Sequence, residues 1–264
     1  MENPRLEAQL LLAHVLGVTR GELLSGSIRT VSEEALSAFW QLVRQRANRV
    51  PLAYLRGYQE FYGLTIQVSR ATLIPRPETE LLVEAALNAV AAISRPVLLD
   101  LCTGSGCIAV ACAVKVPTLR VVASDISEAA LQVARANCQR HGVGERVALV
   151  AGDVATMLRG GWADVITVNP PYIPSAQIPT LQAEVQVHEP WLALDGGPDG
   201  LAVLQRVVAD GYRVLRRGGM LATEVALGQA HEVVDRMVQH RYEKVRTLND
   251  LAGIPRVVLG IRPR

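Results

Sequence analysis

The feature that most constrains the fold is an alternation of apolar strand-like runs with helical segments, which begins after Pro96. This rhythm predicts strands near residues 97–101, 120–124, 146–151, 164–168 and 219–225, with helices near 106–115, 127–141, 200–216 and 228–239. It is typical of a parallel sheet that helices cover on both faces. Two further strand-like runs, 244–248 and 256–261, are separated by a loop too short for a helix. One of these two strands is therefore expected to run antiparallel.

The residues before this region show a helical pattern. Gly17 is expected to end a first helix and Ser32 to cap the start of a longer one. Apolar residues of that second helix recur at helical spacing, which predicts a buried face made by Leu36, Phe39, Trp40, Val43 and Ala47.

From Tyr58 to Val68 the apolar pattern changes to period two, which predicts a β-hairpin. We therefore expect three parts: a helical domain over residues 1–57, a hairpin linker over 58–73, and an α/β domain over 74–264. The last part should open with a helix that Pro77 starts and that runs to about Ile93.

Charge and cysteine content exclude several classes of protein. A net charge of +2 argues against a broad nucleic-acid-binding face. The sequence contains no apolar run long enough for a membrane span, and its charged start does not resemble a signal peptide. The four cysteines show neither a Cys-x-x-Cys pair nor metal-finger spacing. We expect a cytoplasmic protein with reduced thiols, no metal site and no membrane partner.

Four arginines lie in a stretch that contains no acidic residue: Arg44, Arg46, Arg49 and Arg56. Two interpretations remain open on charge pattern alone. The side chains form either a solvated face or a docking patch for an acidic partner.

A glycine-rich turn follows the first predicted strand of the α/β domain and consists of Cys102, Thr103, Gly104, Ser105 and Gly106. Glycines let a backbone turn tightly and approach a ligand. Asp125 ends the next strand, 21 residues after Gly104, and Asp153 ends the third. A carboxylate at Asp125 can accept both ribose hydroxyls, and Asp153 can receive an adenine amino group. Each acid alone could be a helix cap, but together with the glycines they predict a nucleoside site.

The fourth predicted strand runs directly into Asn169-Pro170-Pro171-Tyr172. Two prolines cannot continue a strand's hydrogen-bonded ladder, so the chain should leave the sheet in a stiff, extended form. The Asn169 side chain and the Pro170 carbonyl would then lie at the carboxyl end of the strand, where open α/β sheets bind ligands. Two such acceptors can hold an NH2 group by both hydrogens. The alternative is a simple strand exit with a capping asparagine.

These motifs together resemble those of the peptide chain release factor glutamine methyltransferases, which depend on S-adenosylmethionine. The resemblance covers essentially the whole chain, and four stretches carry it: Leu73–Glu80, Asp100–Gly106, Asn169–Tyr172 and His188–Gly197. It implies a Rossmann-like seven-stranded methyltransferase sheet with an antiparallel last strand, preceded by a small helical domain and a β-hairpin. Two positions depart from the family pattern, Cys102 at a usual glycine and Val154 where many members carry an aromatic residue.

The resemblance also implies a reaction and a set of site residues. The methyl group would pass from S-adenosylmethionine to the side-chain amide nitrogen of the glutamine in the Gly-Gly-Gln motif of release factors. The alternative acceptor is an exocyclic amine of adenine in nucleic acid, although no direct nucleic-acid partner is expected. The implied cofactor-binding residues are Thr79, Cys102, Thr103, Gly104, Ser105, Gly106, Asp125, Asp153, Val154 and Asn169.

For the substrate, the resemblance implies binding by Asn169, Pro170, Pro171 and Tyr172. Asn169 and Pro170 would act as acceptors in catalysis, with Tyr172 as a wall over the glutamine. The helical domain over residues 1–57 would help to dock the release factor, and the Arg44–Arg56 stretch is a candidate contact.

Overall fold

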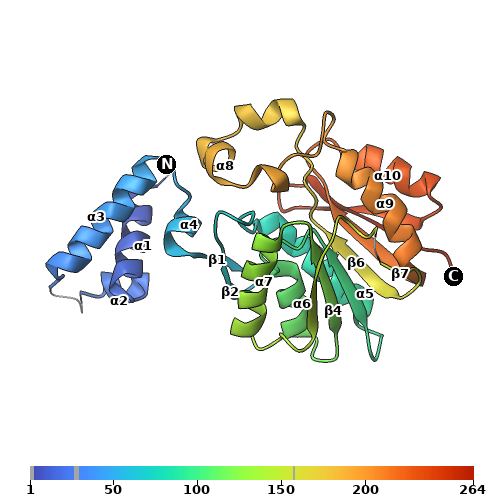
Figure 1. Cartoon of the computed structure of the whole chain (residues 1–264), viewed down its shortest axis with the longest axis horizontal. Helices are drawn as coiled ribbons and strands as arrows, with labels where there is room; N and C mark the ends of the chain where they lie inside the picture. Colours follow the sequence, from blue (N-terminus) through green and yellow to red (C-terminus); the bar gives the residue numbers. More distant parts are fainter. Residues whose placement is uncertain (1–2, 27–29, 157) are drawn as a thin grey trace.

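The computed structural model describes residues 3–26, 30–156 and 158–264 (Figure 1). Residues 1–2 and 27–29 of the expected helical domain, and Met157, lie outside the described residues. The chain begins with four helices, α1 (Pro4–Leu16), α2 (Arg20–Leu24), α3 (Glu33–Ala47) and α4 (Leu52–Arg56). Two predicted helix ends are confirmed. Gly17 terminates α1 with φ of 66°, and the Ser32 side chain accepts a hydrogen bond from the Ala35 amide at the start of α3.

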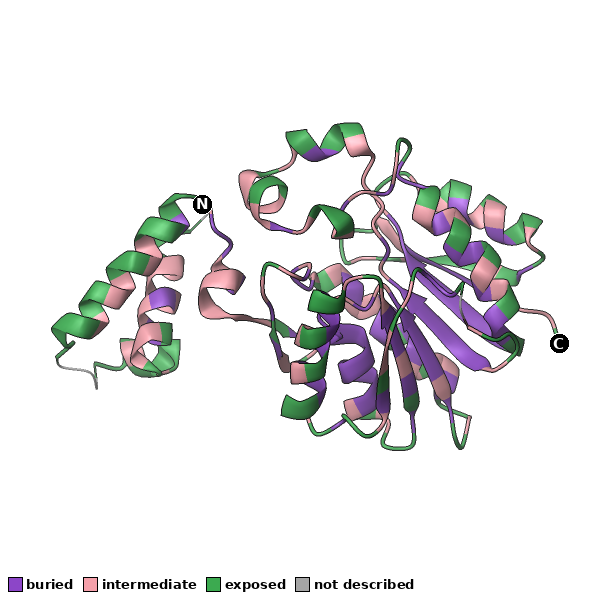
Figure 2. Cartoon of the chain, in the orientation of Figure 1, coloured by how far each residue is buried: buried purple, intermediate pink, exposed green. Residues whose placement is uncertain are grey.

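The predicted buried face of α3 is wrong at several positions. Leu36 is 46% exposed, Trp40 is 51% exposed, and Ala47 is also exposed, whereas Phe39 and Val43 are half-buried. Figure 2 shows most of the length of α3 in the colours of exposed and intermediate residues. The helix packs mainly against α1 and α4. A helix in such a thin layer buries a narrower stripe than its apolar pattern offers.

The expected hairpin is present as β1 (Tyr58–Phe61) and β2 (Leu64–Gln67), which pair antiparallel. Its second strand is fixed to the α/β domain through Asn137 of helix α7 (Glu128–Arg140). The Asn137 side chain accepts a hydrogen bond from the Gln67 amide at 2.7 Å and donates one to the Gln67 carbonyl at 2.9 Å. The hairpin is therefore anchored to the sheet domain by an asparagine that uses both ends of its amide.

The seven-stranded sheet confirms the predicted α/β class. In chain order its strands are β3 (Val97–Leu101), β4 (Arg120–Asp125), β5 (Val147–Ala151), β6 (Ala163–Val168), β7 (Leu215–Glu224), β8 (Glu243–Asn249) and β9 (Pro255–Ile261). The spatial order is β5-β4-β3-β6-β7-β9-β8. The first five run parallel to one another, and β9 is antiparallel to both β7 and β8. The expected antiparallel last strand is thus β9.

Neighbouring residues of each central strand point into two separate cores. Leu98 packs with helices α5 (Glu80–Val90) and α6 (Cys107–Lys115), whereas Leu99 packs with α9 (Ala202–Val214) and α10 (Ala230–Gln239). Buried parallel strands read as continuous apolar runs for this reason, since each face needs its own apolar set. The two helical layers on opposite faces are visible in Figure 1. Among the described residues, no helix has the length and apolar character to cross a membrane.

Between β6 and α9 the chain forms a segment of short helices that the sequence pattern did not indicate. It contains the 3-10 helix η2 (Ser175–Thr180), the helix α8 (Ala183–His188) and the 3-10 helix η3 (Trp191–Ala193). A further 3-10 turn, η1 (Pro77–Thr79), precedes α5. Of these pieces, η1, α8 and η3 contribute residues to the cavities described below.

The structure contradicts both interpretations of the arginine stretch at Arg46. This residue is only 7% exposed, and its guanidinium binds Glu7 of α1 at 2.6 Å and Glu184 of α8 at 3.0 Å. Arg49 also pairs with Glu184, at 2.7 Å, and the Arg56 guanidinium lies 4.1 Å from the centre of the Tyr58 ring. The acidic partners of Arg46 and Arg49 come from distant parts of the same chain, so these two charges are neutralised internally.

Candidate active site

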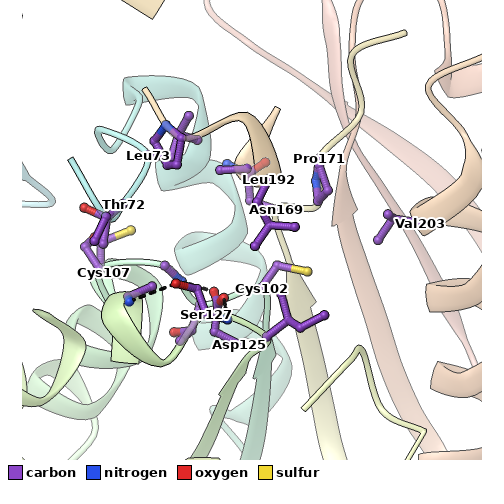
Figure 3. A pocket seen from close by; sticks show the side chains of 18 of the residues that line it. Thr72, Leu73, Cys102, Cys107, Asp125, Ser127, Asn169, Pro171, Leu192 and Val203 are labelled. Atoms are coloured by element: carbon purple, nitrogen blue, oxygen red, sulfur yellow. Dashed lines mark hydrogen bonds between the residues drawn. The ribbon is translucent and has the colours of Figure 1, made fainter. Parts of the chain in front are cut away.

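A cavity of about 300 Å³ lies at the carboxyl ends of β3, β4, β5 and β6. In Figure 3, Leu192, Asn169 and Pro171 lie along one side of it and Asp125 and Ser127 along the other. Most of the predicted cofactor-binding residues line it, namely Thr79, Cys102, Thr103, Gly104, Ser105, Asp125, Asp153, Val154 and Asn169. The strand order brings these tips together because β3 lies between β4 and β6.

Gly106 differs from the other predicted residues because it does not line the cavity. It begins α6 with φ of 77°, and a Cβ at this position would lie 3.1 Å from the Cβ of Ala134 in α7. The requirement for glycine at Gly106 therefore comes from helix packing and backbone conformation.

The glycine-rich turn holds its shape through a buried carboxyl group and left-handed backbone angles. Asp100 accepts hydrogen bonds from the hydroxyls of Thr103, at 2.5 Å, and Thr167, at 2.8 Å. Burial raises the pKa of Asp100 to about 6. Cys102 has φ of 53°, a left-handed conformation that glycine adopts without strain. The departure from the family pattern at Cys102 thus places a side chain on a strained residue.

Asp125 ends β4 and has one backbone partner on each carboxylate oxygen. Its Oδ2 accepts from the Gly104 amide at 2.8 Å, and its Oδ1 accepts from the Ser127 amide at 2.9 Å (Figure 3). Burial raises the pKa of this carboxyl group, although the backbone hydrogen bonds oppose the shift. Each carboxylate oxygen can accept more than one hydrogen bond, so Asp125 retains acceptor capacity toward the cavity that it lines.

At the β5 end of the cavity, Asp153 is paired with a residue that the sequence motifs did not indicate. Arg206 of α9 lines the cavity and binds the Asp153 carboxylate at 2.8 Å. Val154 also lines the cavity and has φ of 54°, which is unusual for a β-branched residue.

Asn169 lies in the walls of two cavities. A second cavity of about 190 Å³ adjoins the first, and its lining includes Asn169, Pro170 and Tyr172 together with Arg76 and Val185. Pro171 lines the first cavity instead. The four residues of the proline exit, Asn169–Tyr172, are therefore divided between the two cavities, and Asn169 borders both.

The amide of Asn169 has one bound end and one unbound end. Its Nδ2 donates to the Thr79 hydroxyl at 3.2 Å. Its Oδ1 is buried and has no hydrogen-bond partner among the described residues. Because buried polar atoms in folded proteins nearly always have partners, an orphaned oxygen in a cavity wall indicates a place for a ligand's donor group.

A buried carboxylate that the sequence motifs missed supports this arrangement. Glu224, the last residue of β7, is 2% exposed. It accepts hydrogen bonds from the hydroxyls of Thr79, at 2.7 Å, and Tyr172, at 3.1 Å. Desolvation raises the pKa of Glu224 to about 7, and burial together with this carboxylate raises the pKa of Tyr172. Its position as an acid at the end of the fifth strand was the available sequence signal.

Two of the stretches that carry the family resemblance, Leu73–Glu80 and His188–Gly197, meet beside the cavities through Glu189. This residue is 6% exposed, accepts a hydrogen bond from the Ile74 amide at 3.3 Å and forms an ion pair with Arg76. Asp195 accepts from the Ser175 hydroxyl at 2.6 Å and from the indole of Trp191 at 3.1 Å. These contacts fix the short helices that close the cavities.

Comparison with known proteins gives two family matches. The model described as "PrmC N-terminal domain" matches residues 1–57, and the "Methyltransferase small domain" matches residues 77–189. The chain is 42% identical over 263 residues to the release factor glutamine methyltransferase of Moorella thermoacetica, an alignment that covers 99% of this chain and 93% of the relative. The chain belongs to the release factor glutamine methyltransferase family. This confirms the family resemblance found in the sequence.

Other relatives and structures agree with this membership. The family member from Gloeobacter violaceus is 43% identical over 256 residues, covering 96% of this chain and 89% of the relative. A solved methyltransferase structure from Pyrococcus furiosus has a TM-score of 0.57 and 18% identity, and covers 83% of this chain and 99% of that one. At this identity the structural likeness establishes only that the family member described here shares a methyltransferase fold.

Proposed function

We propose that this chain transfers a methyl group from S-adenosylmethionine to the side-chain amide nitrogen of the glutamine in the Gly-Gly-Gln motif of peptide chain release factors. The names of its relatives support the class of substrate. The observation that carries the chemistry is the orphaned Oδ1 of Asn169, buried at the junction of the two cavities.

The larger cavity fits a nucleoside-bearing methyl donor. The turn from Cys102 to Ser105 would hold the amino-acid end, Asp125 the ribose hydroxyls, and Asp153 with Val154 the adenine. Thr79 would border the donor from η1. S-adenosylmethionine supplies a methyl group on a positively charged sulfur, which keeps the carbon–sulfur electron pair when that bond breaks.

The smaller cavity would receive the glutamine side chain. A carboxamide nitrogen is a weak nucleophile because its lone pair is delocalised into the carbonyl group. Asn169 Oδ1 and the Pro170 carbonyl would accept its two N–H bonds, fix the nitrogen and favour a more localised lone pair, with Tyr172 as a wall. Such positioning is worth about 7 kcal/mol or more in favourable cases. The nitrogen forms the new bond to carbon, and one amide proton then leaves to water.

We also propose a division of labour along the chain. Residues 1–57 would form a helical docking domain, 58–73 a hairpin linker, and 74–264 the methyltransferase domain. The half-exposed Leu36 and Trp40 on α3 support a docking role, since they are available to a large partner. We propose a protein substrate and no direct nucleic-acid partner, because the net charge is only +2.

The test is incubation with a labelled methyl donor and a purified release factor, followed by mass mapping of the modified residue. We expect one methyl group on the Gly-Gly-Gln glutamine, and no incorporation when that glutamine is replaced by glutamate. Asn169→Ala should lower the rate at least a hundredfold, whereas Asn88→Ala, at an exposed position on α5, should not change it. Labelling of adenine-containing oligonucleotides in place of the release factor would contradict the proposal.

A further inference from the structure

Glu224 is connected to the Asn169 amide through one side chain, that of Thr79, and lies at the buried end of this chain of hydrogen bonds. Asn169 Nδ2 donates to Thr79 Oγ1 at 3.2 Å, and the Thr79 hydroxyl donates to Glu224 Oε2 at 2.7 Å. The Tyr172 hydroxyl donates to the other carboxylate oxygen, Oε1, at 3.1 Å. The three donors come from η1 and from the exit of β6, whereas the carboxylate ends β7.

The direction of each hydrogen bond follows from the carboxylate. An ionised carboxylate only accepts, so the single hydroxyl proton of Thr79 must point toward Glu224. Thr79 Oγ1 can then act toward Asn169 only as an acceptor. Of the two ends of the asparagine amide only the NH2 group donates, so this end faces Thr79 and the oxygen faces the cavities.

We propose that Glu224 is a positioning residue that acts through Thr79 to hold the Asn169 amide with its oxygen toward the reacting nitrogen. This inference rests on the proposed function and extends it by naming what sets the orientation of the acceptor. Glu224 touches neither cavity, because it is absent from both linings. It acts by fixing which end of another side chain the substrate meets.

A neutral carboxyl group would remove this control. A protonated Glu224 can donate to Thr79 Oγ1, which frees the Thr79 hydroxyl proton to point at Asn169. The asparagine amide can then rotate and present its NH2 group, which offers a donor to a substrate NH2 that needs an acceptor. Polar networks in a site of low dielectric are sensitive to such mismatches.

Several groups determine when Glu224 is ionised. The hydroxyls of Thr79 and Tyr172 favour the charged form, Glu78 of η1 disfavours it, and Arg256 of β9 favours it. Cys107 of α6 also faces this carboxylate. With burial dominant, the pKa of Glu224 is raised to about 7, so the orienting form is lost as the pH falls below that value.

The experiment compares the methylation rate and its pH profile in matched variants. The wild-type kcat should fall as the pH drops through about 7. Thr79→Val removes the acceptor for Asn169 and should lower kcat at least tenfold, and Thr79→Ser should restore it to within threefold. Glu224→Gln offers Thr79 either an acceptor or a donor, so it should lower kcat about twofold to tenfold and abolish the acid limb.

Controls separate positioning from packing. Thr223→Val, at a buried neighbour of Glu224 whose hydroxyl donates to the Glu224 backbone carbonyl, should leave kcat and the acid limb unchanged. The Thr79→Val, Glu224→Gln double variant should be no slower than Thr79→Val alone, because both substitutions act on the same chain of hydrogen bonds from Glu224 through Thr79 to Asn169, called the relay below. An acid limb that persists in Glu224→Gln, or a Thr79→Val variant with the wild-type kcat, would overturn the proposal. If Glu224→Gln fails to fold, the comparison of kcat between Thr79→Val and Thr79→Ser tests the proposal.

Failure of the proposed function has a different signature. A wild-type chain that methylates no release factor at any pH would contradict the function and leave the relay to a spectroscopic test. The side-chain NH2 resonance of Asn169, assigned by its loss in Asn169→Ser, should shift between pH 6 and 8 in the wild-type chain. In Glu224→Gln it should not shift, and an equal shift in both proteins would refute the relay.

Discussion

Arg46 of α3 and Glu184 of α8 form an ion pair of 3.0 Å that joins the N-terminal helices to the segment beside the smaller cavity. Val185, the residue after Glu184, lines that cavity. The second guanidinium contact, to Glu7 at 2.6 Å, ties α1 to the same point. The buried Arg46 side chain thus ties the expected docking domain to the wall of the smaller cavity.

Arg46→Met should therefore weaken both folding and substrate binding. It removes the cation between two partly buried carboxylates, and we expect a loss of about 2–4 kcal/mol in the free energy of unfolding. The KM for the release factor should rise more than the KM for the methyl donor, since α8 borders the smaller cavity. Denaturant unfolding and initial rates measure both effects. Arg120→Met, at an exposed position at the start of β4 that lines neither cavity, is the control and should change neither.

Left-handed backbone angles at two positions of one turn predict different changes in stability, because one position carries a side chain and the other is a glycine. Cys102 has φ of 53°, so Cys102→Gly relieves a strain of about 1–2 kcal/mol and should leave the chain at least as stable. Gly104 has φ of 55° and open space at its Cβ position, so Gly104→Ala should destabilise by about 1 kcal/mol without a clash. Equal losses in the two variants, measured by chemical unfolding, would contradict this reading of the turn.

Gly200 lies against the proline exit, and its replacement should impair catalysis. A Cβ at Gly200 would lie 2.4 Å from the Tyr172 carbonyl oxygen, so Gly200→Ala must displace the backbone that positions Tyr172. We expect kcat to fall at least tenfold. Gly253→Ala is the matched control, because Gly253 has a similar φ of 78°, compared with 76° at Gly200, but open space around it. The control should lose stability through backbone strain and retain the wild-type kcat.

The raised pKa of Glu224 also predicts the pH dependence of stability. The ordinary value is 4.5 and the folded value about 7, so between these limits the folded chain binds a proton that the unfolded chain releases. The free energy of unfolding should therefore fall as the pH rises from about 4.5 to about 7, by up to roughly 3 kcal/mol from this group. In Glu224→Gln this contribution should be absent. Denaturant melts at pH 5 and pH 8 give the change in the free energy of unfolding with pH for the wild type and for Glu224→Gln. The two changes would be nearly equal if the folded pKa of Glu224 were not raised.

The sheet could be predicted because its strands are buried on both faces. Val97–Leu101 and Ala163–Val168 are nearly continuous apolar runs, and the glycine turn and the two prolines mark where each of these strands ends. The cavity residues followed from the same signals, since strand tips of a parallel sheet meet at one edge. Local sequence is sufficient to predict a residue's position when that position depends only on where its own strand ends.

The missed features depend on contacts between distant residues. Arg46 finds its acids 39 and 138 residues away, so an acid-free stretch of sequence gave no sign of its burial. Glu224 binds Thr79, which lies 145 residues away in the sequence, and a single glutamate at the end of a strand carries no spacing motif. The exposure of the apolar stripe of α3 does not follow from its sequence, because periodicity shows which face is apolar but does not show whether another element covers it.

Because Asn169 borders both cavities, a molecule in one changes the surface that a molecule in the other meets. Each molecule should then change the affinity of the protein for the other by the same factor, since linkage between binding sites is reciprocal. A non-reactive donor analogue should strengthen the binding of a glutamine-containing peptide as much as that peptide strengthens the binding of the analogue.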